Sequence, residues 1–367
     1  MRLWFIILSQ FLSGSIWFAG NVAHADQDLL LSAVQIGFIF GSLVFAFFNL
    51  PDRFSPARVF FLCALCGAFF NTCGFFIEAY KSWLLMTRLC CGICLAGVYP
   101  VGMKIAASWY PQTISRALGW LVGALVLASG FPYLIRALSW QSHSGFILLT
   151  TSLLCLSGGL IAFKVGDGPH LPKGTKLDLF IIKKIFSHPG FKASSFGYFG
   201  HMWELYAVFA YIPLLLATIV DQHIDFWSFG FFVAGFLGCA AGGMVALKTG
   251  SRIIAMTALF ISASACLLSP VIGELHVPIA LVFVMTWGVA VAADSPQFSA
   301  LNTRFAPKDY VGSALTIVNC IGFLITIITI ELINLWISRL GIQTAFLPLA
   351  VGPIFGWISM KKYRERR

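Results

Sequence analysis

The sequence predicts an all-α integral membrane protein with twelve transmembrane helices in two six-helix bundles. Composition is the first reason, because 59% of the 367 residues are hydrophobic, only 10% are charged, and the mean hydropathy is +0.88. Such a chain is far more apolar than an average soluble domain. Length is the second reason, since a membrane-spanning helix needs about 20 mostly apolar residues and this chain has room for about twelve.

Apolar windows of spanning length recur along the whole chain, with short connections between most of them. They predict spans at residues 3–22, 30–50, 59–78, 83–107, 116–138, 145–164, 194–218, 226–247, 252–271, 277–301, 310–337 and 343–360. The longest polar connection divides these spans six and six. We therefore expect an N-terminal bundle at 1–164, a cytoplasmic linker at 165–193, and a C-terminal bundle with a basic tail at 194–367.

The linker contains the stretch LDLFIIKKIF, in which one acidic residue and two adjacent lysines stand among apolar residues. It is either a short amphipathic helix on the inner membrane surface, held to anionic lipid by Lys183 and Lys184, or part of a solvated connection.

The N-terminus also has features of a signal peptide: a basic start, an apolar run and the triplet Ala23-His24-Ala25. We expect the segment to be retained. The run is long for a signal peptide, it carries Gln10, Ser13 and Trp17, and its removal would leave an odd number of spans.

Lysines and arginines predict the orientation. Most of them fall on one side of the predicted spans, at or near the span ends: Arg2, Arg53, Arg58, Lys104, Arg116, Lys164, Lys173, Lys176, Lys183, Lys184, Lys192, Lys248, Arg252, Arg304, Lys308, Lys361, Lys362, Arg364, Arg366 and Arg367. Only four lie on the opposite side or within spans: Lys81, Arg88, Arg136 and Arg339. The positive-inside rule then puts both termini in the cytoplasm, and we expect a bacterial inner membrane. The net charge of +10 thus reflects topology and not nucleic-acid binding, because no basic cluster sits on a soluble module.

The ten cysteines all fall within predicted spans. Two pairs have CxxC spacing, Cys63 with Cys66 and Cys91 with Cys94, but no ligand cluster lies near either in the sequence. We interpret them as small apolar packing residues, and we expect neither a metal nor a cofactor.

A weak internal repeat relates the two halves. Pro100 and Pro111 in the fourth span are eleven residues apart, as are Pro296 and Pro307 in the tenth, and the offset is 196 for both pairs. Two parallel halves of this kind typically hold a solute site near the membrane midplane between them.

Two motifs stand out: NLPDRFSPARV between the second and third spans, and RLCCGICLAGVYP in the fourth span. Through them the chain resembles the major facilitator superfamily (MFS) of transporters. The sequence NLPDRFSPARV resembles the family's loop between spans two and three, with Ser55 where glycine is usual and Pro56 where a basic residue is usual. The sequence RLCCGICLAGVYP resembles its fourth-span motif, through Arg88 and Gly92. The fifth span lacks the glycine-proline-glycine-glycine signature of drug antiporters, which disfavours drug efflux.

The resemblance covers essentially the whole chain and implies the MFS fold with alternating access. It also implies a gating role for Asp52, Arg53 and Arg58, and a coupling or gating role for Arg88.

The seventh span carries the most informative ionisable residues. Glu204 lies about ten residues into this span, near the midplane, and His201 shares its helix face because the two are three residues apart. Tyr211 continues this face and Trp203 adjoins it. A carboxyl group there can bind and release a proton as access alternates, and the histidine can relay it. The alternative is a hydrogen-bonded pair that only fixes helix packing; a zinc site would lack a third ligand.

Other polar residues are candidates for solute contact or gating. An arginine fork suits a carboxylate or phosphate on a solute, and suits a structural bond equally well. We expect Arg88 and Lys104 to favour an anionic or zwitterionic solute, and Lys104, Asp294 and Gln297 to form an inner gate. Uncharged groups suited to hydrogen-bonding a solute are Gln10, Trp17, Asn21 and Gln35.

These observations predict a monomeric secondary transporter that imports a small anionic or zwitterionic organic solute with protons. Proton-driven efflux of drugs or metabolites remains an alternative. No phosphate-binding GxxxxGK[ST] sequence occurs, which disfavours ATP-driven transport. A membrane enzyme with His201 and Glu204 as acid and base, or a sensor with a transporter fold, are the alternatives from other classes; we expect no enzyme.

Overall fold

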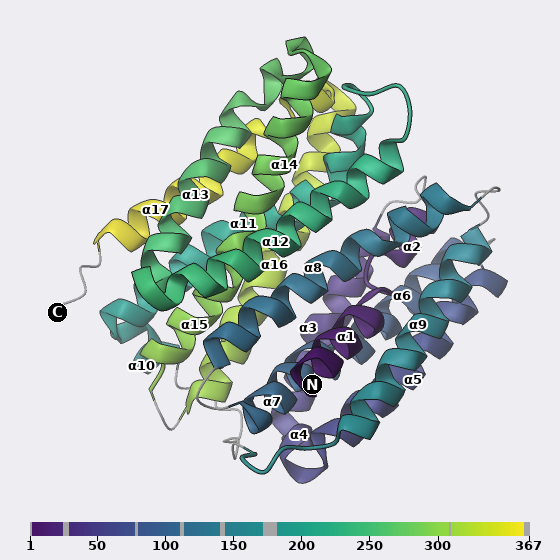
Figure 1. Cartoon of the computed structure of the whole chain (residues 1–367), viewed down its shortest axis with the longest axis vertical. Coiled ribbons are helices and arrows are strands. Elements are labelled where there is room, and N and C mark those ends of the chain that lie inside the picture. The colour runs from purple at the N-terminus through teal and green to yellow at the C-terminus, as the bar shows by residue number, and fades with distance from the viewer. Residues whose placement is uncertain are drawn as a thin grey trace. The chain divides into compact units, whose positions relative to one another are not determined.

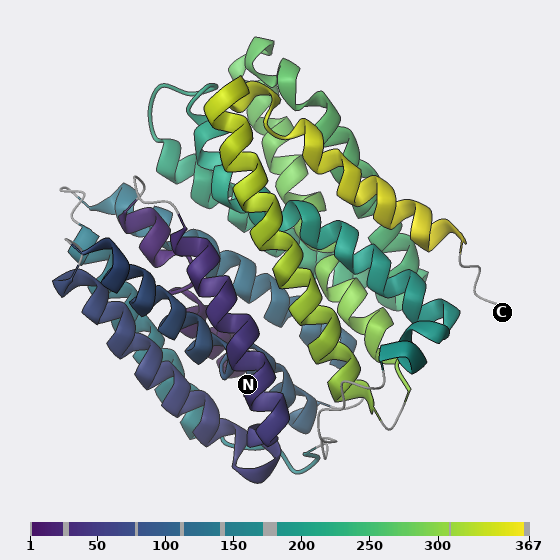
Figure 2. The same cartoon turned by 180° about the vertical axis from the view of Figure 1, so that it is seen from behind.

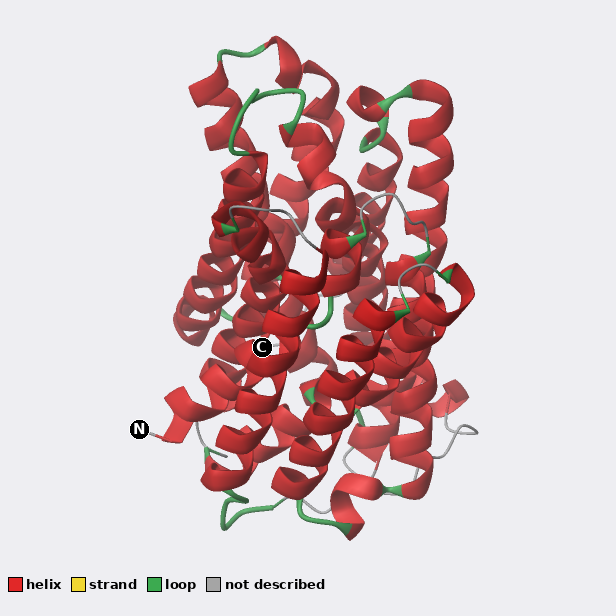
Figure 3. Cartoon of the chain, turned by 90° about the vertical axis from the view of Figure 1, so that its right-hand side faces the viewer, coloured by secondary structure: helices red, strands yellow, loops and turns green. Residues whose placement is uncertain are grey.

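The computed structural model describes residues 2–24, 29–77, 80–110, 114–139, 144–171, 182–307 and 310–362. All regular secondary structure in these ranges is helical, as Figure 3 shows. The chain divides into two compact units, residues 1–177 and 178–367. Residues 172–181 of the predicted linker, the end of the basic tail and Ala25 of the proposed cleavage site lie outside the described residues.

The first unit contains the helices drawn from purple to blue-teal in Figure 1. They are α1 (Arg2–Gly14), α2 (Ala19–Ala23), α3 (Leu30–Phe48), α4 (Leu50–Arg53), α5 (Pro56–Phe76), α6 (Lys81–Ala96), α7 (Tyr99–Trp109), α8 (Ile114–Leu138) and α9 (Ser144–Val165).

The second unit continues in teal, green and yellow, and Figure 2 shows its long helices from behind. They are α10 (Ile182–Ser187), α11 (Pro189–Leu216), α12 (Ile224–Thr249), α13 (Ser251–Leu268), η3 (Ser269–Glu274), α14 (Val277–Ala293), α15 (Ser295–Phe305), α16 (Val311–Leu340), η5 (Ile342–Thr344), η6 (Leu347–Ala350) and α17 (Val351–Lys362).

Eleven helical segments of the described chain are long and apolar enough to cross a membrane. The predicted first span is the exception, because it is broken into α1 and α2. Between them the chain turns, with the Trp17 amide donating to the Gly14 carbonyl at 3.0 Å. Trp17 and Phe18 are fully buried, and irregular backbone at membrane depth is tolerated where protein surrounds it. With this broken segment the fold has twelve spans.

Two further spans are interrupted where the repeat prolines lie. The fourth restarts as α7 with Pro100 in its first turn, and the tenth restarts as α15 with Pro296 in its first turn. Proline suits that position because a first-turn residue needs no amide hydrogen for the helix and its φ is already helical. The break in the tenth span leaves Asp294 at the head of α15.

The seventh span is the long helix α11, which starts five residues earlier than the sequence predicts. His188 caps it, its ring nitrogen accepting from the Phe191 amide at 3.2 Å, and Pro189 opens the first turn. This combination is a strong helix start that the apolar window did not include.

Glycines allow close helix packing in both units. A methyl group at Gly92 of α6 would collide with the Val34 carbonyl of α3, and one at Gly200 of α11 would collide with the Gly352 carbonyl of α17. Small residues let helix backbones approach in this way inside membranes. The contacts fix the rotation of α6 and α11, which carry Arg88 and the pair His201 and Glu204.

Candidate functional site

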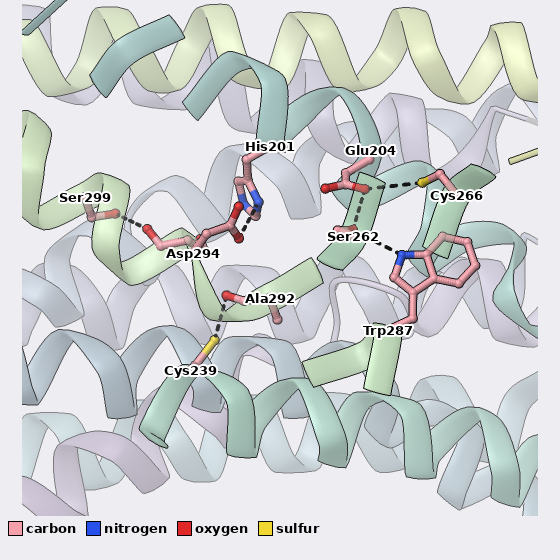
Figure 4. Close-up of polar contacts among 10 residues, drawn as sticks. His201, Glu204, Cys239, Ser262, Cys266, Trp287, Ala292, Asp294 and Ser299 are labelled. Carbon is pink, nitrogen blue, oxygen red and sulfur yellow. Dashed lines mark hydrogen bonds and ion pairs between the residues drawn. The ribbon is translucent and has the colours of Figure 1, made fainter. Parts of the chain in front are cut away.

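Six side chains of the second unit form a buried group that we call the carboxyl cluster. They come from α11, α13, α14 and the head of α15, and they are His201, Glu204, Ser262, Cys266, Trp287 and Asp294 (Figure 4). Each is at most 1% exposed. A buried polar group needs partners inside the protein, so the contacts within this cluster determine its chemistry.

One carboxyl oxygen of Glu204 is held by two donors from α13. Oε2 accepts from the Ser262 hydroxyl at 2.6 Å and from the Cys266 thiol at 3.5 Å, and these donors lie four residues apart on one face of that helix. Trp287 of α14 donates its indole N–H to the Ser262 oxygen at 3.1 Å. The other Glu204 oxygen, Oε1, has no hydrogen-bond partner among the residues that the structure describes, and Figure 4 shows it on the side of His201.

His201 lies against Asp294. Its Nδ1 is 2.9 Å from Oδ1 of Asp294, which is the distance of an ion pair, although the two groups do not meet the angles of a well-directed hydrogen bond. Nε2 of His201 has no hydrogen-bond partner in the described part of the chain. Tyr198 and Phe298 flank the imidazole, with ring centroids 6.0 and 6.2 Å away.

The cluster therefore joins four groups that can gain or lose a proton, two carboxyl groups, an imidazole and the Cys266 thiol, in a region closed to solvent. The two carboxyl groups are close enough to interact electrostatically. Adding or removing one proton changes the net charge of the whole cluster, and a buried uncompensated charge is costly. Within the described ranges, no group of three or more His, Cys, Asp or Glu side chains could hold a metal ion.

A second buried group, the arginine cluster, lies in the first unit and consists of Arg88, Cys91, Asn71, Thr151 and Ser152. Arg88 is fully buried, and its Nη2 donates to Oδ1 of Asn71 at 2.7 Å and to the Cys91 sulfur at 3.2 Å. Its Nη1 reaches the Ile16 carbonyl at 3.5 Å, and its Nε has no partner. No carboxylate contacts this guanidinium among the residues that the structure describes.

The side-chain amide of Asn71 is held with its oxygen toward Arg88. Its amide nitrogen faces three acceptors of α9: the Leu148 carbonyl at 2.8 Å and the hydroxyls of Thr151 and Ser152, each at 2.9 Å. The amide oxygen must therefore face Arg88. Gly20 of α2 lies directly against the arginine side chain, where a larger residue would collide.

The uncharged residues selected for solute contact come from α1, α2, α3 and the turn between α1 and α2. Gln10 is fully buried with no described partner for its amide atoms, and Asn21 has an unpartnered side-chain oxygen. Trp17 packs on Phe38 with ring centroids 5.1 Å apart, and Gln35 is fully buried.

Two aromatic residues of α11 point to neighbouring helices of the second unit. Trp203 donates to the Pro348 carbonyl at 3.2 Å, and Tyr211 donates to the Ile330 carbonyl of α16 at 3.2 Å. Neither joins the carboxyl cluster, so solute contact by them remains a prediction.

The residues selected for gating divide into three groups. Lys104 of α7 forms an ion pair with Asp52 of α4 and also donates to the Pro51 carbonyl at 2.9 Å. Arg53 and Arg58 are exposed. Gln297 is buried on α15, three residues after Asp294.

Comparisons with known proteins decide the family. The sequence model of the Major Facilitator Superfamily matches residues 3–330. The chain belongs to the major facilitator superfamily.

A protein of Haemophilus influenzae named as a metabolite transport protein is 32% identical over 128 residues, which is 33% of this chain and 30% of that relative. Among solved structures, the MFS proton:xylose symporter XylE bound to 6-bromo-6-deoxy-D-glucose is similar in fold, with a TM-score of 0.74 and 13% identity. That match covers 99% of this chain and 96% of the symporter. This MFS protein is accordingly a transporter and not an enzyme.

The MFS transporter holds its buried groups with residues that the sequence did not single out. Ser262, Cys266 and Trp287 support Glu204, and Asn71 orients Arg88. Serine, cysteine and tryptophan are common in apolar spans, so nothing in the sequence marks these positions. A buried asparagine in a span is rarer, and this signal was available for Asn71.

Proposed function

We propose that this MFS transporter imports a small anionic or zwitterionic organic solute together with protons, and that the carboxyl cluster carries the proton. The main support is the state of Glu204: one oxygen is held by Ser262 and Cys266, and the other lies unpartnered beside His201. A buried carboxyl group of this kind changes charge when it takes a proton, as a coupling site must.

The remaining groups of the cluster support the same role. Asp294 lies at the junction of α14 and α15 and contacts His201. A proton on the imidazole would complete an ion pair with that carboxylate, whereas a proton on Glu204 would remove a second negative charge nearby. The fold likeness to a proton:xylose symporter supports proton coupling by analogy.

Arg88 supports an anionic group on the solute. Its guanidinium is permanently charged, fully buried and bonded only to neutral groups in the described chain. Burying a cation without a counter-charge is unfavourable, so an anion that reaches it would be bound favourably.

We further propose a monomer in a bacterial inner membrane with both termini in the cytoplasm. The distribution of lysine and arginine supports this orientation. It puts the ion pair of Lys104 with Asp52 at the inner side, where the family resemblance suggests gating.

A proton-flux assay tests the proposed function directly. Purified protein would be reconstituted in liposomes that enclose a pH-sensitive dye, and a panel of carboxylic acids and amino acids would be added outside. We expect at least one compound to acidify the lumen faster than in protein-free liposomes, which are the control because weak acids also cross lipid in their protonated form; neutral sugars are the second control. Alkalinisation would show antiport and support efflux, and counterflow without any proton movement would contradict coupling. Binding without counterflow would indicate a sensor.

A further inference from the structure

The hydrogen bonds around Glu204 specify which of its oxygens can carry a proton. We infer that protonated Glu204 holds its proton on Oε1, the oxygen on the side of His201, because Ser262, oriented by Trp287, keeps Oε2 as an acceptor. Ser262 and Trp287 are then positioning residues of the proton site. This inference rests on the proposed function, in which Glu204 takes up the proton.

The first step concerns the single hydrogen of the Ser262 hydroxyl. An indole N–H can only donate, so the Ser262 oxygen accepts from Trp287 at 3.1 Å and its own hydrogen is left for Glu204 at 2.6 Å. Serines inside helices commonly donate instead to the carbonyl four residues earlier. Ser264, two residues further along α13, does so, donating to the Phe260 carbonyl at 2.9 Å.

The second step concerns the two oxygens of the carboxyl group. Oε2 faces two donors, the hydroxyl of Ser262 and the thiol of Cys266, so a hydrogen on Oε2 would point at groups that already donate there. Oε1 faces no donor among the described residues. The proton is therefore better accommodated on Oε1, with Oε2 as the carbonyl oxygen.

The third step concerns what lies around that proton. His201 lies one helical turn away on the same face of α11, and Figure 4 shows Oε1 on its side. The other titratable groups that act on Glu204 are Asp294, from the junction of α14 and α15, and Cys266 of α13. Cys239 of α12 bonds the Ala292 carbonyl instead. Proton exchange would thus occur on the face shared with His201 and Asp294, and not through α13.

Infrared difference spectroscopy of proteoliposomes between two pH values tests which oxygen carries the proton, because it follows the carbonyl stretching band of the protonated carboxyl group. The carbonyl band of protonated Glu204 is the band that Glu204→Gln removes. If Oε2 is the carbonyl oxygen, Ser262→Ala deletes its main hydrogen bond and moves that band to higher wavenumber. Trp287→Phe should move it in the same direction by less, because the serine hydrogen is then free to turn away.

Two controls separate this effect from general disturbance of the helix. Ser262→Thr keeps the hydroxyl and should leave the band near its wild-type position. Ser264→Ala removes a hydroxyl from the same helix that bonds only its own backbone, and should not move the band.

The outcomes distinguish the inference from the proposed function. An unshifted band in Ser262→Ala, or one moved to lower wavenumber, would place the proton on Oε2 and overturn the inference while leaving Glu204 as the proton site. Absence of any band that Glu204→Gln removes would overturn the proposed function, and the inference with it.

Discussion

Single residues determine the chemistry of this transporter through the hydrogen bonds that each can make. Glu204 and Arg88 are both fully buried, yet the carboxyl group is held by hydroxyl and thiol donors and the guanidinium by an amide oxygen. Within the described ranges each retains an atom without a hydrogen-bond partner, Oε1 of Glu204 and Nε of Arg88. These atoms are where a proton and an anionic group would bind under the proposed function.

The charge of Arg88 can be tested through its neighbour. Asn71→Asp puts a carboxylate 2.7 Å from the guanidinium in nearly the same shape, so it would neutralise the cation. We expect solute binding to weaken by at least tenfold. Thr151 and Ser152 can turn their hydroxyls to donate to the new carboxylate oxygen, but the Leu148 carbonyl, 2.8 Å from the present amide nitrogen, cannot, so we also expect a lower melting temperature. The measurement is solute affinity by thermal stabilisation. Unchanged affinity would leave Arg88 with a structural role only.

The geometry of Arg88 gives a second prediction. Arg88→Lys keeps the charge but cannot reach Asn71 and Cys91 with a planar fork. Leaving the Asn71 oxygen without its donor costs about 1–3 kcal/mol. We expect a lower melting temperature in detergent together with impaired counterflow. A lysine variant with wild-type stability and activity would show that this position needs only a positive charge and not the planar guanidinium group.

At the scale of the elements, the sequence predicted most helices but not their breaks or their partners. Apolar windows locate a span because hydropathy is a local property of the chain. The break between α1 and α2 depends on burial of Trp17 and Phe18, and the support of Glu204 depends on α13 and α14 facing α11. Such contacts join residues far apart in the sequence, so they cannot be predicted from the local pattern of a single sequence.

The glycine contacts between helices predict unequal effects of adding one methyl group. Gly92→Ala would force apart α3 and α6, and we expect a loss of about 1–3 kcal/mol as in other overpacked sites. Gly312→Ala is the matched control, because no atom of the described residues lies within 4 Å of the added carbon in α16. Detergent melting curves compare them. Equal melting temperatures would show that α3 and α6 can separate without cost.

At the scale of the whole molecule, composition and internal repetition predicted a membrane protein of two similar halves, and two sequence motifs resembled those of the major facilitator superfamily. The family match and the fold likeness confirm the family and the fold. The repeat was readable because Pro100 and Pro296 both open a restarted helix, a backbone requirement that leaves a mark in the sequence. The substrate and the direction of transport cannot be predicted in this way, because they depend on a few side chains brought together from different helices.

Proton coupling through the carboxyl cluster is most directly tested by comparing two kinds of transport in one variant. Glu204→Gln keeps the shape of the side chain but cannot titrate, so liposomes containing it should lose solute accumulation driven by a pH gradient while retaining counterflow. Glu274→Gln, at an exposed position of η3, is the matched control and should behave as wild type. Gradient-driven accumulation that survives in Glu204→Gln would contradict the account.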